Sequence, residues 1–175
     1  MKTLSFLLLY LTVWMLGMSS TTSAKNLVYE NNWAYLADTV MGGVSSGGAE
    51  FSAGSLRLTG QVSTKNNGGF IQVRTRIDPT EAVGKSGIKI KVKGNGDVYY
   101  LHVRNASARL PWQYYTASFQ TNDKWKDILI PFDAFEKSAT LMPRKLKAET
   151  IKTIGVVAYG KDHEADVSIA NLEFY

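Results

Sequence analysis

The sequence contains no cysteine among its 175 residues. This absence excludes disulfide bonds, a thiolate nucleophile, and zinc or iron–sulfur sites with cysteine ligands. It also excludes lipid attachment at an N-terminal cysteine. The hydrophobic core must therefore hold the fold together without covalent cross-links.

Histidine is scarce, since the chain has only two. His102 falls on an outward-facing strand position, and no acidic residue in its own strand could orient it. His163 lies within Asp162–Asp166, where carboxylates and an imidazole could gather a metal ion, although a polar turn explains the same pattern. No nucleophile–base pair and no pair of carboxylates aimed at one bond can be recognised. We expect no enzyme activity, no metal and no cofactor.

Long hydrophobic runs are limited to Leu4–Leu16, which is too short to span a bilayer comfortably. Lys2 precedes this run and Thr22-Ser23-Ala24 follows it, as in a secretory signal with a small-residue cleavage site. We expect residues 1–24 to be a cleaved signal peptide, and residues 25–175 to form one exported domain, periplasmic or secreted, with no transmembrane segment. Lys2 is the only charged residue removed, so the net charge falls from +5 to +4. This mild excess favours acidic partners, but an ordinary solvated basic surface is the simpler explanation.

Helical periodicity is also lacking after Lys25, where short alternating segments are separated by Gly, Asn, Asp and Ser. Ten such segments in about 150 residues predict an all-β fold, either a β-sandwich or a closed barrel. The predicted strands are 27–30, 43–52, 55–62, 69–77, 88–93, 98–105, 113–121, 126–130, 153–159 and 165–174. Single helical turns are expected at 133–137 and 147–152.

The stretch Gly87–Arg104 carries the strongest local signal. Asn95-Gly96 between two alternating runs predicts a two-residue type I′ hairpin turn. The resulting pairs, Val92 with Tyr99, Ile90 with Leu101 and Ile88 with Val103, would make one face of the hairpin core. We expect these six residues to be buried together with Ile71, Val73 and Phe119.

The other face of this hairpin would present Lys91 opposite Tyr100 in a row that ends at Arg104. Gln72 and Arg74 alternate in the preceding strand, and Tyr114 lies near the next. Aromatic rings interleaved with Arg and Gln can stack on sugar rings and hydrogen-bond their hydroxyl or carboxylate groups. These six residues are the predicted ligand-binding set: Tyr100, Arg104, Arg74, Gln72, Lys91 and Tyr114. Mixed polar and aromatic solvated faces are also common on β-sandwiches.

Three glycine-containing stretches do not fit nucleotide binding. Gly84-Lys85-Ser86 looks like the end of a phosphate-binding loop, but Pro79 stands where the first glycine is required and a strand follows instead of a helix. We expect no nucleic-acid partner.

The string Asp38-Thr39-Val40-Met41-Gly42-Gly43-Val44-Ser45 is followed in order by Leu58–Ser63, Asn66–Phe70, Gly94–Gly96, Pro131-Phe132 and Ile154-Gly155. This ordered set resembles the complex I intermediate-associated protein 30 family over nearly all of the chain after the signal. The resemblance implies a non-enzymatic, galactose-binding-like jelly roll. Its motif residues here are Asp38, Met41, Gly42, Gly43, Ser45, Gly69 and Phe70, which we interpret as structural, since paired glycines suggest positive φ or close backbone approach.

The mitochondrial members of the family that the chain resembles act as assembly chaperones for respiratory complex I. Export would separate this chain from complex I, so the fold is expected to carry over, whereas the partner need not. We therefore predict an exported, non-catalytic binding protein for a carbohydrate or other anionic surface ligand. The alternative is an assembly chaperone or adaptor that holds a protein partner.

Overall fold

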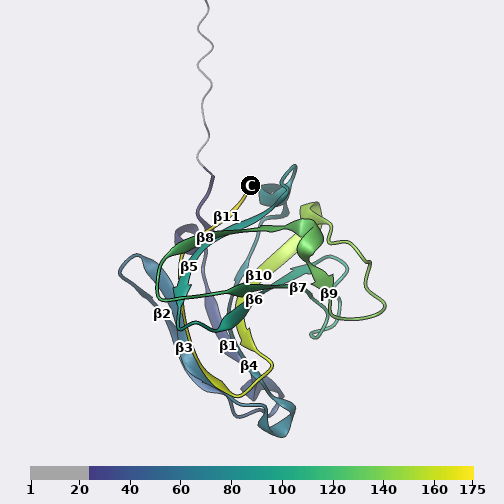
Figure 1. The fold of residues 1–175 in the computed structure, drawn as a ribbon. Coiled ribbons are helices and arrows are strands. Elements are labelled where there is room, and N and C mark those ends of the chain that lie inside the picture. The colour runs from purple at the N-terminus through teal and green to yellow at the C-terminus, as the bar shows by residue number, and fades with distance from the viewer. Residues whose placement is uncertain (1–23) are drawn as a thin grey trace, which may run out of the picture.

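Alternating apolar residues build two antiparallel β-sheets that pack face to face in the computed structural model, which describes residues 24–175 (Figure 1). The six-stranded sheet has the order β1 (Ala34–Ala37), β4 (Phe70–Arg76), β10 (Ile151–Tyr159), β6 (Val98–Asn105), β7 (Tyr115–Gln120), β9 (Glu136–Lys137). The five-stranded sheet has the order β2 (Ser46–Ser52), β3 (Ser55–Val62), β11 (His163–Phe174), β5 (Gly87–Gly94), β8 (Lys126–Pro131). The predicted all-β sandwich is confirmed.

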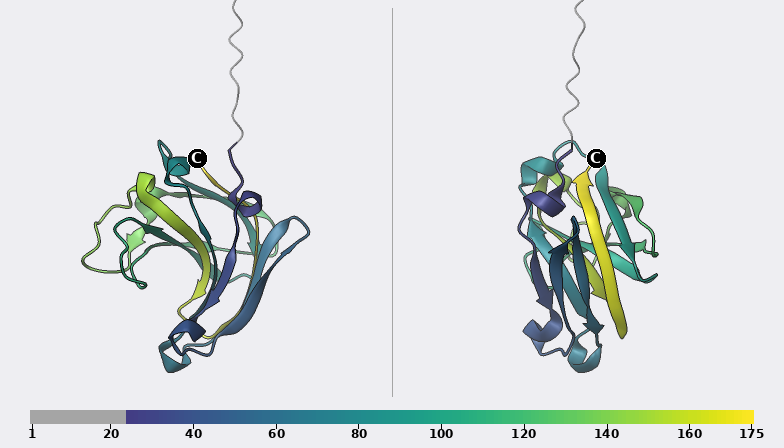
Figure 2. Two further views of the ribbon diagram at one scale, coloured as in Figure 1. Left: turned by 180° about the vertical axis from the view of Figure 1, so that it is seen from behind. Right: turned by 90° about the vertical axis from the view of Figure 1, so that its left-hand side faces the viewer.

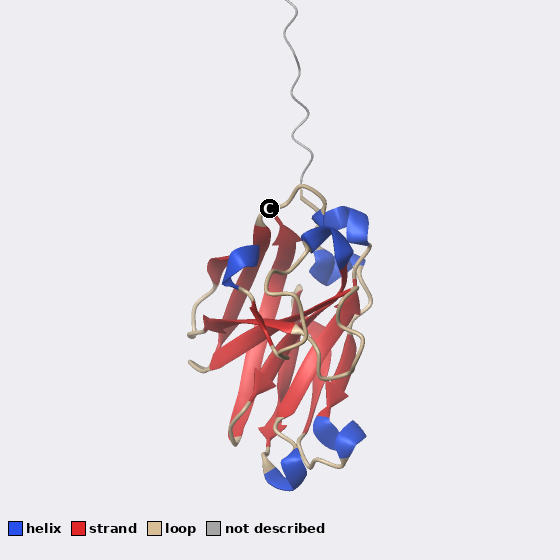
Figure 3. Ribbon diagram, turned by 90° about the vertical axis from the view of Figure 1, so that its right-hand side faces the viewer, coloured by secondary structure: helices blue, strands red, loops and turns tan. Residues whose placement is uncertain are grey.

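Short helices gather near the two ends of the sandwich (Figure 3). They are α1 (Leu27–Glu30) and the 3₁₀ helices η1 (Asp38–Met41), η2 (Lys65–Asn67), η3 (Pro79–Ala82), η4 (Phe132–Ala134) and η5 (Ala148–Thr150). The prediction of a strand at 27–30 was wrong. Asn26 caps α1, because its side-chain oxygen accepts a hydrogen bond from the Val28 amide at 3.0 Å. Strands β1 and β9 were not predicted.

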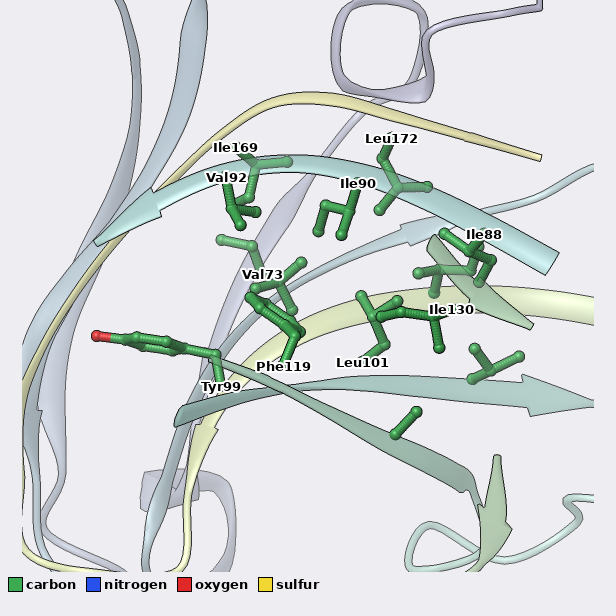
Figure 4. Packing of buried hydrophobic residues seen from close by; sticks show 14 of the residues in the cluster. Val73, Ile88, Ile90, Val92, Tyr99, Leu101, Phe119, Ile130, Ile169 and Leu172 are labelled. Atoms are coloured by element: carbon green, nitrogen blue, oxygen red, sulfur yellow. The ribbon is translucent and has the colours of Figure 1, made fainter. Parts of the chain in front are cut away.

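The core lies between the two sheets, where side chains from both inner faces meet (Figure 4). All nine residues predicted to be buried are buried: Ile71, Val73, Ile88, Ile90, Val92, Tyr99, Leu101, Val103 and Phe119. The ring of Tyr99 stacks on that of Phe119 at 6.2 Å between centroids. The period-2 pattern therefore identified the inner face of each strand correctly.

The predicted hairpin between 88–93 and 98–105 was wrong, because β5 and β6 belong to different sheets. β5 pairs with β11 and β8, whereas β6 pairs with β10 and β7. Only Gly96 has positive φ in the connection, and the Asn95 side chain donates instead to the Glu164 carbonyl of β11 at 2.8 Å. A Cβ at Gly94 would lie 2.8 Å from the Asp166 carbonyl oxygen. A side chain there would therefore block the path of the chain from β5 to the opposite sheet.

Figure 2 shows the sandwich from behind and from the side, with β10 curving along its length in the left view. β10 lies between β4 and β6, so the candidate residues of those two strands share a face with β10 between them. The expected signal peptide lies outside the described residues, apart from Ala24. Among residues 24–175, no helix is long and apolar enough to cross a membrane.

Candidate functional site

Rows of side chains cross the outward face of the six-stranded sheet. Directly paired residues of neighbouring strands point to the same face, so each row can be followed from β4 through β10 to β6. The rows are Gln72–Val157–Tyr100, Arg74–Gly155–His102 and Arg76–Thr153–Arg104. β10 thus supplies the middle of a surface that sequence analysis assigned to its neighbours.

A groove with a volume of about 490 Å³ lies on this face. Its lining includes four of the six residues predicted to bind a ligand, namely Gln72, Arg74, Arg104 and Tyr114, and two residues of the family motif, Met41 and Phe70. The 67–70 segment and η1 contribute at one part of the groove, and the 111–114 segment contributes at another. The fold therefore brings most of the predicted residues together.

The two remaining predicted residues do not line the groove. Tyr100 lies on the same face, with its ring edge-on to Tyr159 at 6.1 Å between centroids. Lys91 was wrongly placed, because it lies in the opposite sheet, paired with Asn171 of β11 and Asp127 of β8. Its assignment depended on the hairpin that does not form.

An aromatic cluster lies on the groove face. The imidazole of His102 stacks on Tyr114, with centroids 4.0 Å apart and planes inclined by 17°. Tyr159 meets His102 edge-on at 5.9 Å. Trp112, which is 62% exposed, lines the same groove. These rings come from three different parts of the chain and give the groove a broad aromatic surface.

The aromatic surface is uncharged at neutral pH, and burial strengthens this. Burial lowers the pKa of His102 to about 4, so the imidazole is neutral. Burial also raises the pKa of Tyr114 to about 12, with a further contribution from Tyr159. His102 is therefore a neutral ring in the groove rather than a cation.

Gly155 lies in the sheet beneath the groove, between Arg74 and His102. It is buried in the middle of its row, and a Cβ built on it would come within 3.0 Å of the Gln72 side-chain oxygen and 3.3 Å of the Val73 carbonyl. A larger residue would project into the groove from this central position.

Arg104 holds the segment 106–113 against the sheet. Its Nε donates to the Gln113 carbonyl at 3.2 Å, and one terminal nitrogen donates to the carbonyls of Ala108 at 3.2 Å and Leu110 at 3.0 Å. Burial, and then the charge of Arg74, lower the pKa of Arg104. Arg104 therefore positions the segment that carries Trp112.

Ser138, just after β9, ties the same segment down from the other side. Its hydroxyl donates to the Trp112 carbonyl at 2.8 Å and accepts from the Tyr114 amide at 2.9 Å. In Figure 1 the long segment between β9 and β10 extends away from the sandwich beside this region. Both aromatic residues of the 111–114 segment are thus fixed through their backbone.

Asp38 joins three separate segments at the part of the groove near η1. The carboxylate is buried and accepts hydrogen bonds from the Ser45 amide and hydroxyl and from the amides of Gly69 and Phe70. Burial raises the pKa of Asp38, but these four hydrogen bonds outweigh it, and the net pKa is lowered.

The motif glycines make room for this network. Gly42 adopts φ 88°, and a Cβ at either Gly43 or Gly68 would collide with the Asp38 carboxylate. The turn also leaves Met41 66% exposed, and Met41 lines the groove. These contacts support the structural interpretation of Asp38, Ser45 and the glycines, whereas Met41 and Phe70 line the groove.

The Asp162–Asp166 segment has no metal-like arrangement. Asp162 accepts from the Thr64 amide and hydroxyl, while Asp166 pairs with Arg57 at 2.8 Å. Nδ1 of His163 lies 2.8 Å from the Lys161 carbonyl. Among the described residues, no group of three His, Asp or Glu side chains could hold a metal ion.

Sequence reasoning placed His102 in the outward row but left it out of the predicted binding set, and it did not consider Gly155 or Tyr159 for the site. One signal was available, since the apolar run Ile154–Ala158 is typical of a central strand buried on both faces. Placing that run between β4 and β6 would have brought Gly155 and Tyr159 into the rows.

The sequence pattern of the Complex I intermediate-associated protein 30 (CIA30) family matches residues 22–169. The chain belongs to the CIA30 family. The resemblance expected from the Asp38–Ser45 string is thereby confirmed. No curated protein sequence matches this CIA30 chain.

Solved structures resemble the CIA30 domain more than their sequences suggest. The Family 11 Carbohydrate-Binding Module of the cellulosomal cellulase Lic26A-Cel5E of Clostridium thermocellum matches with TM-score 0.70 and 15% identity over 89% of this chain and 95% of that one. The Clostridium thermocellum Family 11 module in complex with a β-1,3-1,4-mixed-linked tetrasaccharide gives TM-score 0.68 and 15% identity over 84% and 91%. A Family 30 Carbohydrate Binding Module gives 0.58 and 10% over 84% and 85%. At these identities the likeness shows the fold, and it confirms the predicted galactose-binding-like jelly roll.

Proposed function

We propose that the chain is a non-catalytic carbohydrate-binding module that holds a glycan in the groove of the six-stranded sheet. The observation that carries this proposal is the stacked pair His102–Tyr114, with Trp112 exposed in the same groove. Flat apolar rings offer a surface for the C–H face of a sugar, and nearby polar groups can bind its hydroxyls. The side-chain amide of Gln72 provides such a group in the groove.

Two further observations support binding rather than hydrolysis. Glycosidases use two carboxyl groups that flank the scissile bond. No aspartate or glutamate is found among the described residues that line the groove. The modules of similar fold include one described in complex with a β-1,3-1,4-mixed-linked tetrasaccharide.

Affinity electrophoresis and pull-down on a panel of polysaccharides test the proposal. Tyr114→Ala and Trp112→Ala should each weaken retention by about fivefold to tenfold, as expected for the loss of one aromatic stacking contact. Lys91→Ala is the matched control, because it changes an exposed residue of the opposite sheet. The proposal fails if folded wild-type protein retains no glycan, or if Tyr114→Ala and Trp112→Ala bind like wild type.

We also propose export with removal of residues 1–24, on the basis of Lys2, the apolar run Leu4–Leu16 and Ala24. Intact mass spectrometry of protein from the periplasm or culture medium tests this. The expected species begins at Lys25, and a full-length membrane-bound species would contradict export.

A second candidate function is a protein adaptor, which membership of the CIA30 family favours. Leu141 is 94% exposed in the segment between β9 and β10, where a protein partner could cover it. Affinity capture from the native cell envelope should then return one stoichiometric protein, and Leu141→Ser should reduce its recovery. If no such protein is recovered, the adaptor proposal is wrong and glycan binding remains as the proposed function.

A further inference from the structure

The groove is continuous with a strongly basic hollow. This second hollow, with a volume of about 870 Å³, shares Arg74, Arg104 and Thr153 with the groove. Arg76 and Lys152 line it as well. Four cationic side chains therefore surround one depression at the edge of the aromatic surface.

The strand register explains why these charges converge. Thr153 of β10 stands opposite Arg76 of β4 on one side and Arg104 of β6 on the other. Adjacent strands lie about 4.8 Å apart, so the backbones of the two arginines are separated by about 10 Å across Thr153. Arg74 is two residues before Arg76 on the same face, and Lys152 precedes Thr153.

Most of this positive charge has no carboxylate partner. The salt bridges between described residues do not involve Arg74, Arg76 or Lys152, and no described aspartate or glutamate lines either hollow. The guanidinium of Arg104 already donates hydrogen bonds to backbone carbonyls of the 106–113 segment.

The opposite sheet carries both paired and unpaired cations. There, Arg57 pairs with Asp166 at 2.8 Å and Lys89 with Glu173 at 3.4 Å. Lys91, Lys93 and Lys126 of that sheet form no salt bridge with described residues, so the groove face is distinguished by the convergence of four cationic side chains on one hollow.

We propose that the glycan is acidic, with the carboxylate or sulfate group of one sugar held by Arg74, Arg76 and Lys152. A neighbouring sugar of the same chain stacks on Tyr114 and His102. Guanidinium groups bind planar carboxylate and sulfate oxygens through paired N–H donors, which suits two arginines on one face of a rigid sheet. This inference rests on the proposed glycan-binding function and adds the chemical class of the ligand.

The row geometry supports a single chain that contacts both parts. Arg74 and His102 belong to one row with Gly155 between them, so the cationic and aromatic contacts are about 10 Å apart. Gly155 places no side chain of its own between these two contacts.

Binding to four polymers tests the inference: polygalacturonate, fully methyl-esterified polygalacturonate, a sulfated galactan, and the same galactan after chemical desulfation. The wild-type chain should bind an acidic polymer about tenfold or more tightly than its neutral counterpart, and this preference should shrink as NaCl is raised. Comparison of the two acidic polymers distinguishes a carboxylate from a sulfate ligand.

The variant Arg74→Gln/Arg76→Gln should lose about fivefold or more in affinity for the acidic polymer and change little for the neutral one. Lys91→Gln/Lys124→Gln removes the same charge from exposed positions elsewhere and should change either affinity by less than about twofold. Tyr114→Ala should weaken binding of both forms, which separates specific binding from simple charge attraction.

The possible failures are distinguishable. If neutral and acidic forms bind equally and Arg74→Gln/Arg76→Gln has no effect, the inference is wrong while the carbohydrate-binding function stands. If the control double variant loses as much as the arginine variant, or if Tyr114→Ala has no effect on acidic polymers, the preference is nonspecific and the inference is again overturned. If no polymer binds, the proposed function itself fails.

Discussion

His102 lies parallel to Tyr114 at a centroid distance of 4.0 Å, and burial lowers its pKa to about 4. Glycan binding should therefore be nearly independent of pH between about pH 8 and pH 5, because the imidazole stays neutral throughout. Below about pH 4 the ring gains a charge, and binding should weaken. NMR titration of the His102 ring signals checks this, and a midpoint near the ordinary value of 6.5 would contradict it.

The lowered pKa of His102 also makes the free energy of unfolding fall as the pH is lowered. The unfolded chain protonates His102 near pH 6.5, whereas the folded chain does so only near pH 4. The contribution to stability is complete above about pH 6.5 and is lost as the pH falls toward 4. Replacement of His102 by Phe should flatten the pH dependence of the unfolding midpoint in this window.

Asp38→Asn should destabilise the fold by about 1–3 kcal/mol, because it disturbs an acceptor that serves buried donors of Ser45, Gly69 and Phe70. The lowered pKa of Asp38 adds a pH signature: its contribution is present above the ordinary value of 3.8 and is lost as the pH falls through the folded pKa. Urea unfolding measures the change. Asp133→Asn, at an exposed position of η4, is the control and should have little effect.

Gly155→Val should reduce glycan binding more than it reduces stability. The new side chain would point into the groove, and the first atom it meets is the flexible Gln72 amide oxygen. Gly48→Ala on β2 is the matched control, since nothing lies within 4 Å of the added Cβ. Thermal unfolding and polymer binding are measured in parallel. If the Gly155→Val protein is folded and binds glycan like wild type, the ligand does not lie over Gly155.

Arg104→Lys should loosen the 106–113 segment, because a single ammonium cannot reproduce the guanidinium's bonds to Ala108, Leu110 and Gln113. Faster hydrogen–deuterium exchange in this segment and weaker glycan binding are expected. Arg76→Lys, in the same row, should leave the exchange unchanged. Equal exchange in wild type and Arg104→Lys would mean that Arg104 does not position the segment.

The sequence predicted which residues face the core but not which strands are neighbours. β3 and β6 have the bounds that were predicted for them, because alternation at period 2 depends only on one buried face. The same alternation fits a hairpin within one sheet and a connection between two facing sheets. For that reason the pairing of β5 with β6 was wrong, and Lys91 was assigned to the wrong face.

The candidate site was predictable in part for the same reason. Gln72, Arg74, Arg104 and Tyr114 were predicted to share one surface because each lies at an outward position in or near a strand, and all four line the groove. The contribution of Gly155 depends on the order β4–β10–β6, which follows from contacts distant in sequence. The role of Arg104 depends on carbonyl positions in a loop, and no residue pattern encodes them.

The most direct test of the account is NMR mapping of the backbone amides during titration with polygalacturonate and sulfated galactan oligomers. The account predicts shifts centred on His102, Tyr114 and Gly155, with further shifts at Arg74 and Arg76 for the acidic oligomer that binds. The outward positions Lys91 and Leu129 on the opposite sheet should not respond. Shifts centred on the five-stranded sheet, or none at saturating oligomer, would contradict the placement of a glycan in the groove.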